Sequence, residues 1–270
     1  MPISFIKRKI RRVSRRVRNW STIASLTLKG NRVGKNTRLA NAKHPILMIY
    51  GFGSSRRTMA ILETRLRQDG HVTFSLNLGG FIGTFNTVSI EESARYIDKK
   101  VEEFYKKYNI QGKLNLVGHS KGGLIGSYWI KFLNGARRVN TLVTLGAPYN
   151  GTPWGYFSYI PGVSLVLKSL KQLKPNSIFL QRLRETPYPK RVKVFSVYSK
   201  DDNACPFPAS VLEEADNVKN IEIPSATHSE LLVKKTVFNI IRHALKNEMP
   251  ESLIDATRKN IVEFFGTREI

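Results

Sequence analysis

The sequence predicts an α/β fold in which a mostly parallel central sheet is covered by helices on both faces. With 270 residues, of which 41% are hydrophobic, the chain is long enough for one large domain with a substantial buried core. From residue 45 onward, short continuous apolar runs alternate with longer segments of helical periodicity. Continuous runs indicate strands that are buried on both faces, and their alternation with helices is typical of parallel βαβ units.

The elements expected from these patterns follow one another to the end of the chain. The expected strands are 46–50, 72–78, 114–117, 141–145 and 192–198, with 221–223 as a candidate for the last one. The expected helices are 55–68, 121–133, 229–246, 251–265 and a long helix that begins after Ser89. Ser89 and Glu92 have the spacing of a capping box, which predicts where that long helix begins.

The net charge of +24 is unusual and is distributed unevenly. Residues 1–43 contain thirteen Lys or Arg, and no acidic residue occurs before Glu63. Such a segment attracts anionic surfaces such as a membrane, a nucleic acid or an acidic polymer. We therefore divide the chain into a basic N-terminal extension, residues 1–43, and a folded domain, residues 44–270.

Residues 3–20 are expected to form a basic amphipathic helix. Its apolar side chains recur at spacings of three or four and therefore share one face: Ile3, Ile6, Ile10, Val13, Val17 and Trp20. A helix of this kind lies in a membrane interface with its cations toward lipid phosphates. Docking on the protein's own core and nucleic-acid binding are the alternatives. We favour peripheral contact with an anionic membrane through residues 1–20.

Several other classes of protein find little support in the sequence. No stretch is long and apolar enough to span a bilayer, and the segment after the arginines fits a cleaved signal peptide poorly. We expect a cytoplasmic protein or one peripheral at the membrane, with export left open. Cys205 is the only cysteine, and no zinc or calcium spacing is present, so we expect neither a metal nor a cofactor. The sequence does not indicate an oligomeric state.

The strongest chemical signal is Gly118-His119-Ser120-Lys121-Gly122, between an expected strand and an expected helix. In this context G-x-S-x-G forms a sharp turn that exposes the serine hydroxyl above the sheet. Gly118 and Gly122 remove side chains that would collide across the turn. The helix that begins behind Ser120 directs its positive end toward developing negative charge. Ser120 is therefore the candidate nucleophile.

A serine hydroxyl needs a general base, and with this turn the acid and the histidine follow the serine along the chain. His243 falls within an expected helix, whereas His228 falls in a loop between a strand and a helix and is the candidate base. Asp201 and Asp202 both follow the expected strand 192–198. The spacing within that loop favours Asp202 as the acid that orients the imidazole, with Asp201 as the alternative.

Two backbone amides are needed to bind the oxyanion of a tetrahedral intermediate. The N–H of Lys121, the residue after the nucleophile, is the first candidate. The second is expected from the loop Gly51-Phe52-Gly53 after the first strand. Because its glycines allow the backbone to approach a substrate closely, we assign the second donor to the Phe52 N–H.

Together these segments resemble bacterial lipases and esterases of the α/β-hydrolase superfamily. The resemblance covers about residues 44–245 and is carried by Gly51-Phe52-Gly53, the turn around Ser120, Leu145-Gly146-Ala147-Pro148-Tyr149-Asn150-Gly151-Thr152, the Asp202 loop and His228-Ser229. It implies an α/β-hydrolase fold and cleavage of a carboxylic ester through an acyl-enzyme on Ser120. The sequence departs from the family at Tyr50, where these enzymes usually carry histidine.

The resemblance also implies a small cap, inserted at about residues 150–185. Its apolar side chains are numerous: Trp154, Tyr156, Phe157, Tyr159, Ile160, Val163, Leu165, Val166, Leu167, Leu170 and Leu173. Such a segment either covers an acyl-binding groove and opens at a lipid surface, or packs on the core. We expect a lipid or another apolar acyl ester as the substrate. The alternatives are an acyltransferase that uses the same residues, and a non-catalytic basic membrane- or nucleic-acid-binding protein on a hydrolase scaffold.

Overall fold

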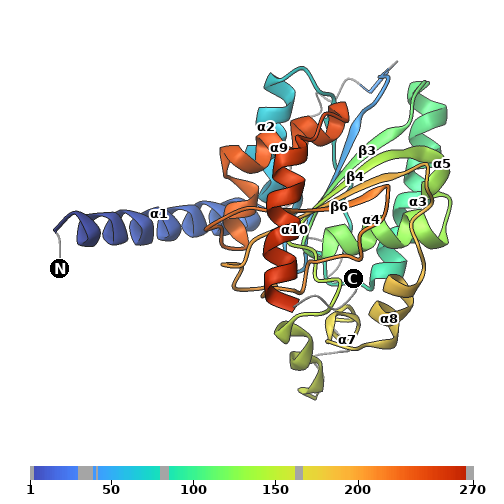
Figure 1. Ribbon diagram of the computed structural model, residues 1–270. Helices are drawn as coiled ribbons and strands as arrows, with labels where there is room; N and C mark the ends of the chain where they lie inside the picture. The colour runs from blue at the N-terminus through green and yellow to red at the C-terminus, as the bar shows by residue number, and fades with distance from the viewer. Residues whose placement is uncertain (1–2, 30–38, 41, 80–84, 162–166, 266–270) are drawn as a thin grey trace.

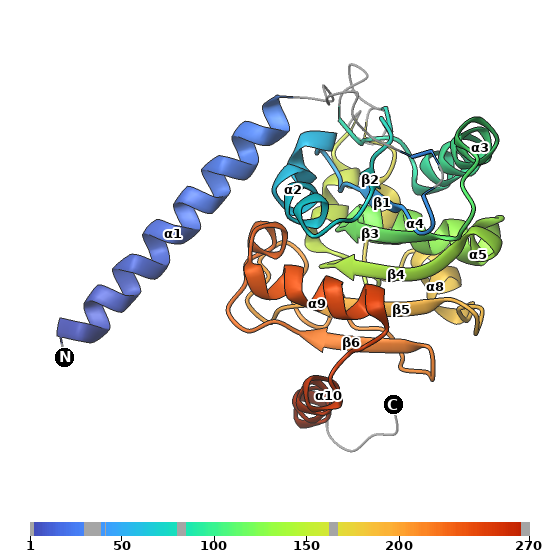
Figure 2. The same ribbon diagram turned by 90° about the horizontal axis from the view of Figure 1, so that it is seen from above.

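A six-stranded parallel sheet in the order β2-β1-β3-β4-β5-β6 forms the centre of the protein (Figures 1 and 2). The computed structural model describes residues 3–29, 39–40, 42–79, 85–161 and 167–265. Its strands are β1 (Ile46–Ile49), β2 (Thr73–Phe74), β3 (Leu114–His119), β4 (Val139–Leu145), β5 (Lys193–Tyr198) and β6 (Val218–Glu222). The predicted fold class is confirmed.

Helices cover both faces of the sheet (Figure 1). The longer ones are α2 (Ala60–Gln68), α3 (Ile90–Tyr108), α4 (Lys121–Phe132), α8 (Ile178–Glu185), α9 (Lys235–Lys246) and α10 (Glu251–Phe265). Short helical turns are η1 (Arg56–Met59), α5 (Gly135–Arg138), η3 (Pro153–Tyr159), α7 (Leu170–Leu173) and η4 (Ser229–Leu232). Helices α3 and α4 pack together on one face, α2 and α9 on the other, and α10 packs against β6.

Strand register brings the loops of the candidate site to one edge of the sheet. Ile49 at the end of β1 pairs with Gly118, and His119 at the end of β3 pairs with Leu145. The loops that follow these strands therefore begin at the same level. Ligand sites in parallel α/β sheets lie at this carboxyl edge.

Helix α4 lies unusually close to the strands beneath it. A Cβ atom on Gly122 would lie 2.1 Å from the carbonyl oxygen of Ile49, and one on Gly123 would lie 2.6 Å from Ala147 Cβ. Only glycine allows this approach, which sets the height of the helix start behind Ser120. At its other end, the buried Trp129 donates a 2.8 Å hydrogen bond to Asp98, which joins α4 to α3.

The long helix after Ser89 begins as predicted. Ser89 Oγ accepts a hydrogen bond from the Glu92 N–H, and the Glu92 carboxylate accepts one from the Ser89 N–H, each at 3.2 Å. This reciprocal capping box satisfies two amides that lack partners within the helix.

Several expected elements differ in their bounds from those observed. The expected helix 55–68 begins as the 3₁₀ turn η1 before α2, and the expected strand 221–223 is observed as β6, which begins at Val218. Strand β2 is shorter than the expected 72–78, because it pairs with β1 only at Thr73 and Phe74. The expected helix 229–246 is divided into η4 and α9. The division follows from the N–H groups of Val233 and Lys234, which both donate to the Glu230 carbonyl and close a tight turn there.

The N-terminal helix α1 (Ile3–Leu28) is longer than the predicted 3–20 and projects beyond the rest of the molecule (Figures 1 and 2). Its second half packs against η1 and η4. Ile23 is buried there, and Thr27 bonds the Thr58 hydroxyl at 3.0 Å. These contacts explain why the half-polar segment after Trp20 continues the helix. Among the described helices, none combines the length and apolar character needed to cross a bilayer.

Candidate active site

Ser120 lies at a sharp turn between β3 and α4 in a backbone conformation that side chains rarely adopt. Its φ and ψ angles are 54° and −128°. The Ser120 N–H donates to the Leu145 carbonyl at 2.9 Å, which ties the turn to β4. A Cβ on Gly118 would lie 2.7 Å from Gly123 Cα, so the turn requires glycine there. Non-glycine residues at positive φ store strain, which is typical of functional positions.

Asp202 and His228 form a hydrogen-bonded pair beside this turn. His228 Nδ1 lies 2.8 Å from Asp202 Oδ2. The other carboxylate oxygen of Asp202 accepts from the N–H groups of Ala204 and Cys205, at 2.9 and 2.8 Å. The Asp202 side chain is only 1% exposed and that of His228 is 17% exposed. The carboxylate is thus held in one orientation, and the imidazole remains partly accessible.

The neighbouring Asp201 has a different environment. Its side chain is 45% exposed and lies 3.8 Å from Arg16 of α1. Of the two candidates for the acid, Asp202 lies against His228, whereas Asp201 faces α1.

Gly146, after β4, provides the space for the pair. A Cβ at this position would lie 2.8 Å from Asp202 Oδ2 and 3.1 Å from His228 Nδ1. Its φ of +58° also favours glycine. A larger residue than glycine at position 146 would therefore collide with the Asp202–His228 pair.

Ser199 joins the two loops that carry the pair, a role not recognised from the sequence. Its hydroxyl accepts from the Asp201 N–H at 3.2 Å and from the Ala226 N–H at 3.1 Å. One side chain thus connects the loop after β5 to the loop that leads to His228. Its position directly after the strand was the available sequence signal.

Cys205 is the second residue that sequence reasoning missed at the site. Its buried sulfur lies close to the Asp202–His228 pair, with ligand atoms of the three residues within 4.8 Å of one another, and the Ser120 side chain is near enough to lower the pKa of the thiol. Ser120 and His228 therefore both lie near the Cys205 side chain. Burial raises the pKa of the Cys205 thiol, with smaller effects from His228, Asp202 and Ser120.

His228 is flanked by a further histidine. The buried His119 lies with its ring centroid 4.5 Å from that of His228, and its Nε2 is 3.2 Å from the His228 carbonyl. Burial, and then the nearby His228, lower the pKa of His119, so it is neutral. Burial also lowers the pKa of His228, but Cys205 and Asp202 outweigh this effect and the net shift is upward.

The expected oxyanion loop lies directly against Ser120. A Cβ on Gly51 would lie 2.9 Å from Ser120 Cβ. Among the described residues, no turn or loop hydrogen bond uses the Phe52 N–H, and Lys121 is the first residue of α4, where amides have no acceptor within the helix. Both amides are therefore candidates to bind a substrate oxygen.

Tyr50, which stands where the lipases and esterases that the sequence resembles usually carry histidine, lies between the end of β1 and this loop. Its buried hydroxyl accepts a 2.8 Å hydrogen bond from the Leu78 N–H. Burial, partly offset by that bond, raises the pKa of Tyr50 to about 12. The neutral phenol therefore ties β1 to the segment after β2 without adding charge.

The candidate cap is divided between exposed and buried side chains. In η3, the lowest segment in Figure 1, and at Ile160 directly after it, five apolar side chains are about half exposed or more: Trp154, Tyr156, Phe157, Tyr159 and Ile160. Leu170 and Leu173 of α7 are buried. Val163, Leu165 and Val166 lie outside the described residues. Thr152, at the start of η3, donates to the Ala204 carbonyl at 2.5 Å and so joins the cap to the Asp202 loop.

Within the described residues, one cluster has the composition of a metal site. Ligand atoms of Asp202, Cys205 and His228 all lie within 4.8 Å of one another. The Asp202 oxygens and His228 Nδ1 are already joined by hydrogen bonds. We therefore interpret the cluster as an acid–base arrangement.

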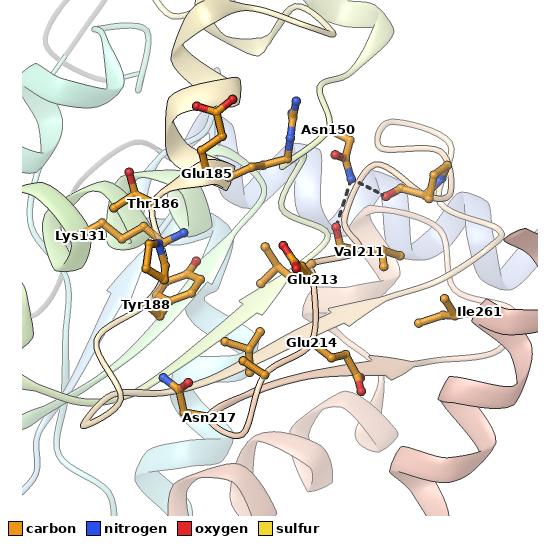
Figure 3. Close-up of a pocket in the computed structure, with 16 residues that line it drawn as sticks. Lys131, Asn150, Glu185, Thr186, Tyr188, Val211, Glu213, Glu214, Asn217 and Ile261 are labelled. Carbon is orange, nitrogen blue, oxygen red and sulfur yellow. Dashed lines mark hydrogen bonds between the residues drawn. The ribbon is translucent and has the colours of Figure 1, made fainter. Parts of the chain in front are cut away.

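A separate pocket of about 700 Å³ lies away from these residues (Figure 3). Lys131 and Tyr188 line one side, and Ile261 of α10 the other. Lys131 Nζ lies 3.8 Å from the centre of the Tyr188 ring and donates to the Leu183 carbonyl at 2.7 Å. Ser120, Asp202 and His228 are not among its lining residues.

The fold and this arrangement of side chains define an α/β hydrolase. A model of the family described as "Alpha/beta hydrolase of unknown function (DUF915)" matches residues 82–248, and the chain belongs to that family. The chain is also 31% identical over 136 residues to the Caenorhabditis elegans protein "Abhydrolase domain-containing protein abhd-5.2". The match covers 48% of this chain but only 28% of the nematode protein.

Solved structures with a similar fold include three lipolytic enzymes. Aspergillus fumigatus lipase B has a TM-score of 0.63 at 15% identity, over 82% of this chain and 56% of that one. Mature Bacillus licheniformis lipase BlEst2 has a TM-score of 0.60 at 16% identity, over 79% and 95%. Legionella pneumophila phospholipase PlaB has a TM-score of 0.61 at 13% identity, over 81% and 62%. At these identities the likeness concerns the fold.

Proposed function

We propose that this protein is a serine ester hydrolase, a lipase or carboxylesterase, that cleaves lipid or other apolar acyl esters. The observation that carries the proposal is that the Asp202–His228 pair lies beside the Ser120 turn, across Gly146 and next to Cys205. A strained serine, a partly accessible imidazole and a buried carboxylate are the parts that acyl transfer requires.

The proposed reaction has two halves. His228 removes the Ser120 proton as Oγ attacks the ester carbonyl, and the Phe52 and Lys121 amides stabilise the oxyanion. His228 then protonates the leaving alcohol, which departs and leaves an acyl-enzyme. Water, deprotonated by the same histidine, releases the acid and restores Ser120. Asp202 keeps the imidazole in the required orientation throughout.

Two further observations support an apolar acyl group as the substrate class. The exposed aromatic side chains of η3 form a surface suited to an acyl chain or a lipid interface. Thr152 links that segment to the Asp202 loop, so the apolar surface begins next to the proposed acid.

The proposal is tested by p-nitrophenyl esters of increasing chain length together with a fluorophosphonate probe. The wild-type protein should hydrolyse these esters, and the probe should label Ser120, identified by peptide mass spectrometry. Ser120→Ala should abolish both while its circular dichroism stays unchanged. Adding a long-chain alcohol distinguishes hydrolysis from acyl transfer, because a transferase would form a new ester. Full activity in the Ser120→Ala protein would refute the proposal.

We also propose that α1 brings the protein to an anionic membrane surface. Val13, Val17 and Trp20 are exposed, with relative accessibilities of 55%, 61% and 67%. The side chains of Ile3, Ile6 and Ile10 lie outside the described residues. A cationic helix with an unburied apolar face suits a lipid interface better than a solvated surface.

A further inference from the structure

Lys121 carries a buried amino group beside the proposed oxyanion site. The residue follows Ser120 directly and is 0% exposed. Its Nζ donates to Asn86 Oδ1 at 2.8 Å, to the Asn86 carbonyl at 3.3 Å and to the Val88 carbonyl. All three partners are acceptors, and an ammonium group has three donors. The contacts therefore match the charged form of the side chain.

Asn86, the main partner of Lys121, holds the expected oxyanion loop at several points. Its Nδ2 donates to the Tyr50 carbonyl at 2.9 Å. Its backbone carbonyl accepts from the Gly53 N–H at 3.2 Å, and its own N–H donates to the Ser54 carbonyl at 3.1 Å. These bonds enclose Phe52 on both sides, so the position of Asn86 determines where the Phe52 amide points.

We propose that Lys121 is a positioning residue that fixes both halves of the oxyanion hole. Its backbone N–H is one donor, and its ammonium group holds Asn86, which in turn holds the Phe52 amide. One side chain thus ties the helix that carries the nucleophile to the loop that faces it. The inference rests on the proposed function, because it assigns a task within the same site.

The energetics of the position favour a functional reason for lysine. Burial lowers the pKa of Lys121 well below its ordinary value, and Glu91 and Glu92 at the start of α3 oppose this only in part. A buried charge usually stabilises a fold less than an apolar side chain of similar size. Replacing Lys121 by methionine should therefore leave the free energy of unfolding unchanged or raise it. A buried lysine that does not stabilise the fold is expected where the side chain is needed for activity.

The test compares Lys121→Met with Lys131→Met, which changes a matched lysine on the same helix. Lys131 is half-buried and donates to the Leu183 carbonyl of α8, and its other neighbour, Tyr188, follows α8. Lys121→Met should lower kcat for p-nitrophenyl esters by about 100-fold and leave KM within about twofold, because only transition-state stabilisation is lost. Lys131→Met should retain wild-type kcat.

A second readout is the rate at which a fluorophosphonate labels Ser120. In that reaction Ser120 Oγ bonds to phosphorus, fluoride departs, and His228 accepts the serine proton. Labelling of Lys121→Met should slow by a factor comparable to the loss of kcat, because the phosphoryl oxygen also uses the oxyanion donors. Asn86→Ala should reproduce both losses. The double variant should be no worse than the more severe single one, since both changes remove the same connection.

The outcomes separate this inference from the proposed function. A folded Lys121→Met protein with wild-type kcat and labelling rate would overturn the inference, and so would Asn86→Ala with wild-type kinetics if Lys121→Met fails to fold. A wild-type protein that is not labelled at Ser120 would instead refute the proposed hydrolase, and the inference with it.

Discussion

At the scale of single residues, sequence neighbours have acquired opposite environments. Asp201 is exposed and lies near Arg16, whereas Asp202 is buried and accepts hydrogen bonds from His228 and two backbone amides. Ser120 and Lys121 form another such pair, since the serine is partly exposed and the lysine is buried.

Asp202→Asn should lower kcat far more than Asp201→Asn. An amide cannot stabilise the imidazolium that forms during the reaction and favours the wrong tautomer, which costs roughly 10⁴-fold in a serine protease. Asp201→Asn should remain near wild type, because that side chain faces α1. Steady-state kinetics on p-nitrophenyl butyrate would measure both variants. The opposite ranking would show that Asp201 is the acid.

The pH dependence of kcat/KM should reflect the raised pKa of His228. The histidine acts as a base only when it is neutral, so activity is lost as pH falls through its pKa. Because Cys205 and Asp202 outweigh the effect of burial, the acidic limb should lie above pH 6.5, about the ordinary value for histidine. Rates corrected for spontaneous hydrolysis would locate the limb. A midpoint at or below that value would contradict the assigned environment of His228.

At the scale of elements, α1 uses one face to dock and leaves another face exposed. Ile23 packs on the core, and Asn19 donates to the buried Glu230 at 3.3 Å. Val13, Val17 and Trp20 are exposed instead. Docking on the protein's own core, one of the alternatives for this helix, thus uses a different face from the predicted apolar one.

The triple variant Val13→Ser, Val17→Ser and Trp20→Ser should bind anionic vesicles more weakly than wild type. The substitutions leave the net charge unchanged, so a lower affinity would reflect lost apolar insertion. Hydrolysis of a soluble short-chain ester should stay near wild type. Vesicle co-sedimentation with phosphatidylglycerol liposomes measures the binding, and Ser21→Ala with Ser25→Ala serves as a control on the same helix. Unchanged co-sedimentation would argue against the membrane role of this face.

At the scale of the whole molecule, the excess positive charge is concentrated at one end. Residues 1–43 supply thirteen Lys or Arg of the 44 in the chain. Helix α1, which carries many of them, projects beyond the rest of the molecule in both views (Figures 1 and 2). The molecule is therefore strongly polarised, and the docked part of α1 places Arg16 near Asp201 in a loop of the candidate site.

Association with anionic vesicles should weaken as salt is added. The Debye length shortens from about 10 Å at 0.1 M to about 3 Å at 1 M ionic strength, which screens exposed cations. Binding to phosphatidylglycerol vesicles should fall steeply between about 0.05 and about 0.5 M NaCl, because the screening of exposed cations becomes strong over this range. Binding to phosphatidylcholine vesicles should be weak throughout. Salt-independent binding would show that charge does not drive the association.

The sequence by itself predicted the features that depend on local spacing. The capping box, the G-x-S-x-G turn and the apolar strand runs each involve residues a few positions apart, so their geometry follows from the helix and strand repeats. The alternation of apolar strand runs with helical segments also predicted the parallel sheet. The order of serine, acid and histidine along the chain left His228 and His243 as candidate bases. The expected loop position then favoured His228, and the spacing within the loop after strand 192–198 favoured Asp202 over Asp201.

The tertiary structure decided the features that depend on contacts between distant segments. Cys205 beside Ser120, Ser199 between two loops, Lys121 on Asn86 and the docking face of α1 all belong to this class. No sequence period relates such residues, because their proximity arises only when strands in register bring separate loops to one edge of the sheet. Burial also distinguishes Asp202 from Asp201, since only the buried carboxylate is held by two backbone amides.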